Sequence, residues 1–191
     1  MRIIAGEFRG RKLLPPEGDV TRPITDRVKQ SLFDILAPVI EGARVYDCFA
    51  GTGSMGLESL SRGAARATFF EADRSALARL RKNIAAVGVA DRSTVVAGDL
   101  FRWFAATTPA QRADVVFLDP PYRFLSERPN ELRKLAGSIA SAHLAPGGVM
   151  VFRHDARDAL DVPGLAPDDR REYGGMVLEF LRAVEGTAGP G

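Results

Sequence analysis

The segment Asp119-Pro120-Pro121-Tyr122 combines three groups that could act together on an amine. The Asp119 carboxylate and the Pro120 carbonyl can both accept hydrogen bonds from one exocyclic NH2 group, while the prolines restrict the backbone and Tyr122 offers a ring face to a base. Two acceptors on the amine help its nitrogen to aim a lone pair at an electrophilic methyl group. The segment therefore indicates amino methylation. The alternative is a Pro-Pro pair that only ends a strand, followed by a surface tyrosine.

A glycine-rich loop at residues 47–56 contains the spacing G-x-G-x-x-G, with Gly51, Gly53 and Gly56 as its glycines. Glycines at such a strand-to-helix turn let the backbone approach a nucleotide-like ligand at the mouth of a sheet. In a dinucleotide site the helix N-terminus faces a pyrophosphate, but Asp47 would direct a negative charge into the same mouth. That charge suits an ammonium group better, so the loop favours S-adenosylmethionine over a nicotinamide cofactor. A purely structural turn is the remaining alternative.

Acidic residues at the ends of the next two expected strands complete a candidate adenosine pocket. Glu71 lies twenty positions after Gly51, where a carboxylate can accept hydrogen bonds from both ribose hydroxyls. Asp73 competes for this role, but its position predicts that it caps the following helix, so we favour Glu71. Asp99 could accept a hydrogen bond from an adenine amino group, or it could cap the helix that starts at Leu100; both readings stay open.

Hydrophobic periodicity predicts an α/β fold in which strands and helices alternate. Apolar runs at 115–118 and 149–152 lack polar alternation, as in parallel strands covered on both faces, and Gly174-Gly175 predicts an antiparallel hairpin at the end. We therefore expect a Rossmann-like, doubly wound, mostly parallel sheet, with residues 119–122 beside its topological switch point. The expected strands are 44–49, 67–71, 94–97, 114–119, 148–153, 169–173 and 176–181. The expected helices are 26–36 (capped by Thr25 and stopped by Pro38), 54–61, 75–87 (closed by Gly88), 100–105 and 131–142.

Length and composition bound the possibilities. The chain has 191 residues, 46% of them hydrophobic, which predicts one globular methyltransferase domain over 24–182, a basic N-terminal arm or hairpin over 1–23 and a flexible tail over 183–191. No apolar run approaches the length of a membrane span and no secretion signal is evident, so we expect a cytoplasmic protein. A single cysteine, Cys48, and two histidines exclude an internal disulfide and a structural zinc cluster. Cys48 is predicted to be a core thiol.

Positive charge is concentrated at the N-terminus. Residues 1–30 hold seven basic side chains against four acidic ones, although the whole chain carries a formal net charge of only +2. Such clustering can hold a phosphate backbone near the surface, and a solvated basic face is an equally good explanation.

Together these motifs resemble the bacterial small-subunit (16S) rRNA guanine-N2 methyltransferases, which use S-adenosylmethionine. The resemblance spans nearly the whole chain. The glycine loop and residues 119–122 alone indicate only the broader class of methyltransferases. The specific strings are RIIAGEFRGR at 2–11, RPITDRVK at 22–29 and LESLSRGA at 57–64.

The resemblance implies a role for each motif. The catalytic role falls on Asp119, Pro120, Pro121 and Tyr122. Cofactor contacts fall on Thr25, Asp47, Phe49, Gly51, Thr52, Gly53, Glu71, Asp99 and Leu100. RNA phosphates are expected to meet Arg2, Arg9, Arg11, Lys12, Arg22 and Arg27. The chain departs from the family pattern at Ile24, at Gln30 and at Arg153-His154, where an acidic residue is common.

The expected activity is therefore transfer of a methyl group to the exocyclic N2 of an extruded guanine in 16S rRNA, or in the assembling small ribosomal subunit. We expect no metal, no membrane association and a monomer. An adenine-N6 methyltransferase acting on DNA or RNA remains an alternative, because residues 119–122 fit any exocyclic amine. A non-catalytic RNA-binding assembly factor is a second alternative.

Overall fold

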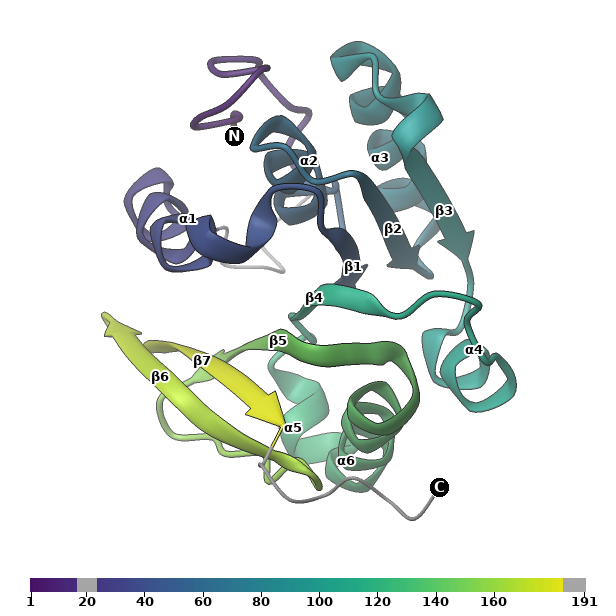
Figure 1. Cartoon of the computed structure of the whole chain (residues 1–191), viewed down its shortest axis with the longest axis vertical. Helices are drawn as coiled ribbons and strands as arrows, with labels where there is room; N and C mark the ends of the chain where they lie inside the picture. The colour runs from purple at the N-terminus through teal and green to yellow at the C-terminus, as the bar shows by residue number, and fades with distance from the viewer. Residues whose placement is uncertain (17–23, 184–191) are drawn as a thin grey trace. The chain divides into compact units, whose positions relative to one another are not determined.

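The computed structural model describes residues 1–16 and 24–183. The chain forms two compact units, one ending at Leu100 and one beginning at Phe101. Strands and helices alternate through both units (Figure 1). In chain order the elements are α1 (Asp26–Ile40), β1 (Arg44–Cys48), α2 (Ser54–Ser61), β2 (Arg66–Glu71), α3 (Arg74–Val87), η1 (Ala90–Arg92), β3 (Ser93–Ala97), α4 (Leu100–Ala106), β4 (Ala113–Leu118), α5 (Arg123–Glu127), α6 (Pro129–Ser138), η2 (Ile139–His143), β5 (Leu144–Asp155), β6 (Leu165–Tyr173) and β7 (Met176–Ala183).

The first unit contains three parallel strands in the order β3-β2-β1. Their apolar side chains form its core, in which Phe69 and Phe70 of β2 are completely buried. Helix α2 packs against β1 and β2, and it is buried from Gly56 to its last residue. The glycine loop therefore joins a buried strand to a buried helix.

Helices α1 and α3 begin at the predicted caps. The Thr25 hydroxyl accepts a hydrogen bond from the backbone N–H of Val28, and the Asp73 carboxylate accepts one from Ala76. The prediction that Pro38 stops α1 is wrong, because the helix continues to Ile40. A proline in the last turn removes only one intrahelical hydrogen bond, and the burial of Ile40 stabilises the extension.

Residues 1–14 form a hairpin-like arm; the rest of the predicted arm, from residue 17 to residue 23, lies outside the described residues. An antiparallel bridge joins Arg2 to Lys12, and Leu13 donates its N–H to the carbonyl of Met1. The arm passes so close to the end of α2 that a Cβ at Gly6 would lie 1.8 Å from the Ser61 carbonyl oxygen. Glycine is therefore required at this crossing.

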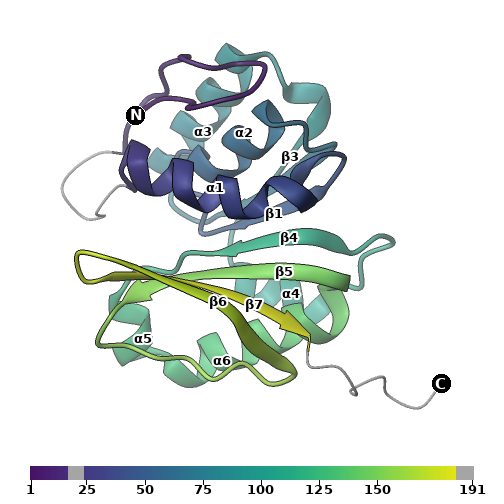
Figure 2. The same ribbon diagram turned by 60° about the vertical axis from the view of Figure 1, so that its left-hand side comes forward.

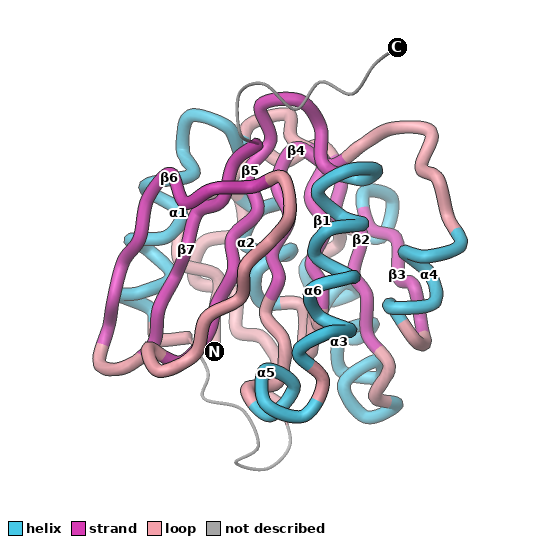
Figure 3. The backbone as a smooth tube through the Cα atoms, turned by 90° about the horizontal axis from the view of Figure 1, so that it is seen from below, coloured by secondary structure: helices cyan, strands magenta, loops and turns pink. Residues whose placement is uncertain are grey.

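The second unit is built on β4 and β5, which are parallel, and on β7 and β6, which continue from β5 in antiparallel pairing. Figures 2 and 3 show β6 and β7 side by side as the predicted hairpin. Its turn holds Gly174 and Gly175 at φ 54° and 84°, the left-handed pair that a tight two-residue hairpin requires. Helix α5 was not predicted. The predicted helix 131–142 instead starts at Pro129 and ends as a π-helical turn over Ile139–His143.

The alternation of strands and helices, the parallel pairs in each unit and the antiparallel hairpin confirm the predicted Rossmann-like fold class. Cys48 is buried as predicted, and burial raises the pKa of its thiol well above the ordinary value. In the part of the chain that the structure describes, no helix is long and apolar enough to cross a bilayer. Within the same residues, no cluster of His, Cys, Asp and Glu is arranged to hold a metal ion.

Candidate active site

The backbone of the glycine loop has the left-handed turns that its sequence predicts. Gly51 has φ 56° and Gly53 has φ 84°, and Phe49 adopts φ 62°, which is uncommon for a residue with a side chain. A Cβ at Gly53 would meet Leu80 at 2.5 Å, whereas a Cβ at Gly51 would meet nothing within 4 Å. The loop therefore packs tightly against α3 on one side and leaves its backbone accessible to a ligand at Gly51.

The third glycine and Asp47 hold α2 against the sheet. A Cβ at Gly56 would lie 2.3 Å from the Phe69 ring, so only glycine permits this packing. The Asp47 side chain is 2% exposed, and its Oδ2 accepts a hydrogen bond of 2.9 Å from the Gly56 N–H. Asp47 thus binds the first turn of the helix. Its contact with a ligand ammonium group stays a prediction.

Glu71 lies at the carboxyl end of β2, and backbone N–H groups orient its carboxylate. Oε2 accepts from Gly51 at 2.7 Å, and Oε1 accepts from Ala72 and Asp73 at 2.8 Å. Asp73 itself is engaged in capping α3, and its hydrogen bond from Ala76 lowers the pKa of its carboxyl. Because Asp73 is engaged in capping, Glu71 is favoured as the carboxylate that accepts hydrogen bonds from a ribose.

The other residues predicted to contact the cofactor lie at the ends of nearby elements. The Gly98 N–H donates to the Glu71 carbonyl at 2.9 Å, which ties the carboxyl ends of β2 and β3 together. Asp99 follows directly and is exposed, and Leu100, the first residue of α4, is buried. Thr25 is exposed at the start of α1, whereas Thr52 is buried inside the glycine loop.

These groups fit a nucleoside ligand with a positive charge. Asp47, Glu71 and Asp99 lie at or just beyond the carboxyl ends of β1, β2 and β3, and a loop with an accessible backbone lies between the first two strands. Ligands of such folds bind at the carboxyl ends of the strands. Carboxylates can accept hydrogen bonds from ribose hydroxyls and amines, and they attract a cation. The arrangement suits S-adenosylmethionine better than a ligand with phosphate groups.

In the second unit, Asp119 directly follows β4 and pairs with Arg153, which was not among the predicted site residues. Arg153 of β5 donates from Nε to Oδ1 of Asp119 at 2.7 Å. Burial raises the pKa of the Asp119 carboxyl, and Arg153 opposes that shift. The register of the two strands brings this pair together, because Leu118 lies opposite Phe152 and the residues that follow them are Asp119 and Arg153.

The chain turns into α5 directly after the two prolines. Pro120 is buried, and the Pro121 carbonyl accepts a hydrogen bond of 2.8 Å from Phe124. Tyr122 precedes the first residue of α5, and the Arg153 guanidinium lies 5.9 Å from the centre of its ring. Arg153 therefore contacts both the carboxylate and the aromatic ring of the predicted catalytic segment.

The predicted RNA-binding side chains are exposed on the arm and at the start of α1. Arg2 forms an ion pair with Asp26 at 2.8 Å, and Arg11 donates to the Ala86 carbonyl at 2.9 Å. Arg22 lies outside the described residues. The exposed members of the set are Arg2, Arg9, Arg11, Lys12 and Arg27.

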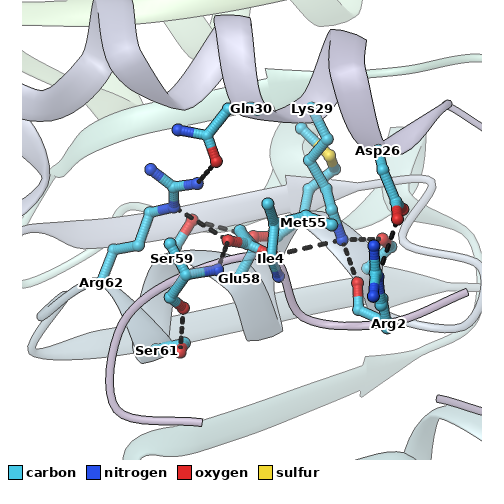
Figure 4. Close-up of polar contacts among 12 residues, drawn as sticks. Arg2, Ile4, Asp26, Lys29, Gln30, Met55, Glu58, Ser59, Ser61 and Arg62 are labelled. Atoms are coloured by element: carbon cyan, nitrogen blue, oxygen red, sulfur yellow. Dashed lines mark hydrogen bonds and ion pairs between the residues drawn. The ribbon is translucent and has the colours of Figure 1, made fainter. Parts of the chain in front are cut away.

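A buried polar cluster that was not predicted from the sequence lies beneath the arm. Lys29 of α1 and Glu58 of α2 form an ion pair of 3.2 Å, and both side chains are almost completely buried. Nε of Arg62 lies 2.8 Å from Oε1 of the same carboxylate (Figure 4). A charge inside the otherwise uncharged string SMGLESLS of α2 was the available signal, because a buried charge requires a partner.

Known proteins share both the sequence and the fold. The ribosomal RNA small subunit methyltransferase D of Escherichia coli K12 is 46% identical over 123 residues, which cover 64% of this chain and 61% of the E. coli protein. The protein of the same name from Haemophilus influenzae is 42% identical over 125 residues, covering 65% of each chain. The matched segments therefore span less than two thirds of these relatives.

Solved structures extend the similarity over most of the chain. A protein from Escherichia coli has a TM-score of 0.82 at 33% identity and covers 96% of this chain and 97% of its own. An RNA methyltransferase from Salinibacter ruber, solved in complex with S-adenosyl-L-homocysteine, has a TM-score of 0.62 at 25% identity, covering 83% of this chain and 92% of its own. The family model described as conserved hypothetical protein 95 matches residues 1–182. The chain therefore belongs to this family, and it is similar to ribosomal RNA small subunit methyltransferase D.

Proposed function

We propose that this protein uses S-adenosylmethionine to methylate the exocyclic N2 of a guanine in 16S rRNA, in the cytoplasm. The observation that carries the proposal is the Asp119 carboxylate directly after β4, which accepts a hydrogen bond from Arg153 and is followed by Pro120, Pro121 and Tyr122. A half-buried acceptor beside an aromatic ring suits an amine on a flat base. The relatives named as rRNA methyltransferases support RNA as the substrate class.

The protein's part in the reaction is mainly positioning. S-adenosylmethionine supplies an electrophilic methyl group on a positively charged sulfur. Asp119 and the Pro120 carbonyl accept the two amine hydrogens of a guanine that has left its stack, and Tyr122 holds the ring. The N2 lone pair forms the new C–N bond as the C–S bond breaks, and the sulfur keeps that electron pair. The methylated nitrogen then releases one proton, for which the ionised Asp119 carboxylate is a nearby acceptor.

The RNA is proposed to lie against the arm. Arg9, Arg11 and Lys12 are exposed there, and phosphate contacts by such side chains make RNA affinity fall with salt. Replacing Arg9 and Arg11 by glutamate should weaken RNA binding and flatten its dependence on salt. Arg133→Glu, at an exposed position of α6, is the matched control. Equal salt slopes in the double variant and the wild type would exclude the arm as a phosphate contact.

The direct test is methyl transfer from labelled S-adenosylmethionine to unmethylated 16S rRNA and to small subunits, with mass spectrometry of the nucleosides. N2-methylguanosine supports the proposal. Methyladenosine would replace the target by adenine, and binding of RNA without any product would favour an assembly factor.

Asp119→Ala tests the mechanism. The variant should lose turnover while it retains nearly full affinity for S-adenosylhomocysteine, because the carboxylate is assigned to the base. Asp161→Ala, which removes an exposed aspartate elsewhere, should remain active. An active Asp119→Ala enzyme would refute the proposed role of this carboxylate.

A further inference from the structure

The N-terminal arm, defined here as residues 1–14, is hydrogen-bonded to two buried polar side chains that also contact the glycine loop at residues 47–56. One is Lys29, on α1, and the other is Asn83, on α3; each is 1% exposed. Buried polar groups need hydrogen-bond partners. Loss of the hydrogen bond between one of these side chains and the arm therefore changes the other hydrogen bonds of the same side chain. All the residues involved belong to the first compact unit.

The first connection runs through Lys29 and the start of α2. Its Nζ donates to the Arg2 carbonyl at 2.7 Å and to the Ser54 hydroxyl at 3.3 Å. Ser54 is the first residue of α2 and directly follows Gly53 of the glycine loop. Figure 4 shows the Lys29 side chain reaching down from α1 toward Arg2.

Glu58 fixes the arm at the same place. Its Oε2 accepts from the Ile4 N–H at 2.8 Å, and its Oε1 accepts from the Ala5 N–H at 3.0 Å. The same carboxylate forms the ion pair with Lys29. Undocking of the arm would therefore remove two donors from a completely buried carboxylate, and would remove an acceptor from Lys29.

The second connection runs through Asn83 and enters the loop itself. Oδ1 of Asn83 accepts from the Leu14 N–H at 2.8 Å, and Nδ2 donates to the Leu14 carbonyl at 3.3 Å. Nδ2 also donates to the Thr52 carbonyl at 2.9 Å. Thr52 lies between Gly51 and Gly53, so one amide group joins the end of the arm to the middle of the glycine loop.

We propose that the docked arm is a part of the cofactor site, and that Asn83 and Lys29 are the positioning residues through which arm docking sets the affinity of the glycine loop for S-adenosylmethionine. The arm holds the loop in its binding conformation before the ligand arrives, which reduces the entropy lost on binding. This inference rests on the proposed function in one respect. If the arm also binds RNA, RNA and cofactor each raise the affinity of the other, because such coupling is reciprocal.

The test measures the dissociation constant of S-adenosylhomocysteine by calorimetry, at a temperature where every variant is folded. Asn83→Leu removes the amide at similar volume, and Leu14→Pro removes the arm's N–H donor at an exposed position. We expect roughly fivefold or greater weakening in each variant. Their matched controls are Ile84→Ala, which destabilises the same helix but leaves these hydrogen bonds, and Leu14→Ala, which keeps the donor. Both controls should stay within about twofold of the wild type.

The double variant Asn83→Leu with Leu14→Pro separates positioning from general destabilisation. If both substitutions break the same link, the double variant binds S-adenosylhomocysteine no more weakly than Asn83→Leu alone. If they act independently, their fold-changes in the dissociation constant multiply. Unchanged affinity in both single variants, or multiplied effects in the double variant, would overturn the inference. Failure of the wild type to bind S-adenosylhomocysteine would instead overturn the proposed function.

Coupling to RNA is measured by repeating the titration with 16S rRNA transcribed in vitro. The wild type should bind S-adenosylhomocysteine several-fold more tightly in the presence of the RNA. For Asn83→Leu, the ratio of the dissociation constants without and with RNA should be near one. A wild-type ratio of one while the RNA binds would overturn the coupling between the two ligands.

Discussion

Replacement of Glu58 by glutamine tests whether the buried cluster holds the arm and α2 together. Glu58 is completely buried and accepts from Ile4, Ala5, Lys29 and Arg62. Glutamine has nearly the same volume, but it lacks the charge, and its one oxygen replaces only part of this acceptor set. Arg62 is less affected, because it also reaches other acceptors on α1.

The expected loss follows from the partners that remain. Removing one charge of a buried ion pair costs about 3–5 kcal/mol. Lys29 keeps the Arg2 carbonyl and the Ser54 hydroxyl as acceptors, so we expect the lower end of that range, about 3 kcal/mol. For a chain of this length the melting temperature should then fall by roughly 6–12 °C.

The loss of stability in Glu58→Gln should also depend on pH, and the lowered pKa of Lys29 sets the direction of that dependence. Burial lowers the pKa of Lys29 below its ordinary value of 10.5, and Glu58 opposes this shift. Between the lowered pKa and 10.5 the unfolded chain binds a proton that the folded chain does not, so stability rises with pH in that window. Without the Glu58 charge the pKa falls further and the rise begins at lower pH. The deficit of Glu58→Gln should therefore be largest at neutral pH and smaller near pH 10.

The assay is urea unfolding of the wild type and the variant, followed by circular dichroism at pH 7 and pH 10. Asp34→Asn is the matched control, since it makes the same acid-to-amide change at an exposed partner of Arg62, 3.9 Å away. It should cost less than about 1 kcal/mol. A Glu58→Gln loss no larger than that of Asp34→Asn, or a deficit equal at both pH values, would refute the reasoning.

Three further substitutions have defined outcomes. Gly56→Ala would bring a Cβ to 2.3 Å from Phe69, so thermal unfolding should show a loss of about 1–3 kcal/mol. Arg153→Met removes the cation that opposes the raised pKa of Asp119; the acid limb of the pH–rate profile should move to higher pH, and an unmoved limb would contradict the pairing. Thr25→Ala removes the cap of α1 and should cost about 1 kcal/mol in urea unfolding, against no loss if the cap is unimportant.

Local signals predicted most of the fold. Helix α2 has the predicted bounds, and α3 begins one residue earlier than predicted because Asp73 caps it. The errors occur where proline signals conflict with packing. Pro38 lies within α1, and α6 begins at Pro129 instead of residue 131, since a proline at the first helical position loses no intrahelical bond. The five-residue helix α5 is too short to show a periodic pattern.

The candidate site was predictable where it depends on backbone and spacing. The glycines at 51, 53 and 56 require left-handed turns or close packing, and both appear in the structure. Arg153 was noticed only as a departure from the family pattern. Its role in holding Asp119 depends on the register of β4 against β5, which no local pattern in the sequence specifies.

The buried cluster shows why polar interiors are hard to predict from periodicity. Periodicity assigns charged side chains to the solvent face of a helix, and for Lys29 the opposite holds because its partners come from the arm and from α2. Helix α2 offers a different signal. It is buried on nearly every side, so the Glu58 carboxylate inside it must accept hydrogen bonds from donors on other segments. Three of the four donors come from residues 29 or more positions away. A lone charge in a buried helix therefore indicates that a distant segment must dock there, and in this chain that segment is the arm proposed to bind RNA.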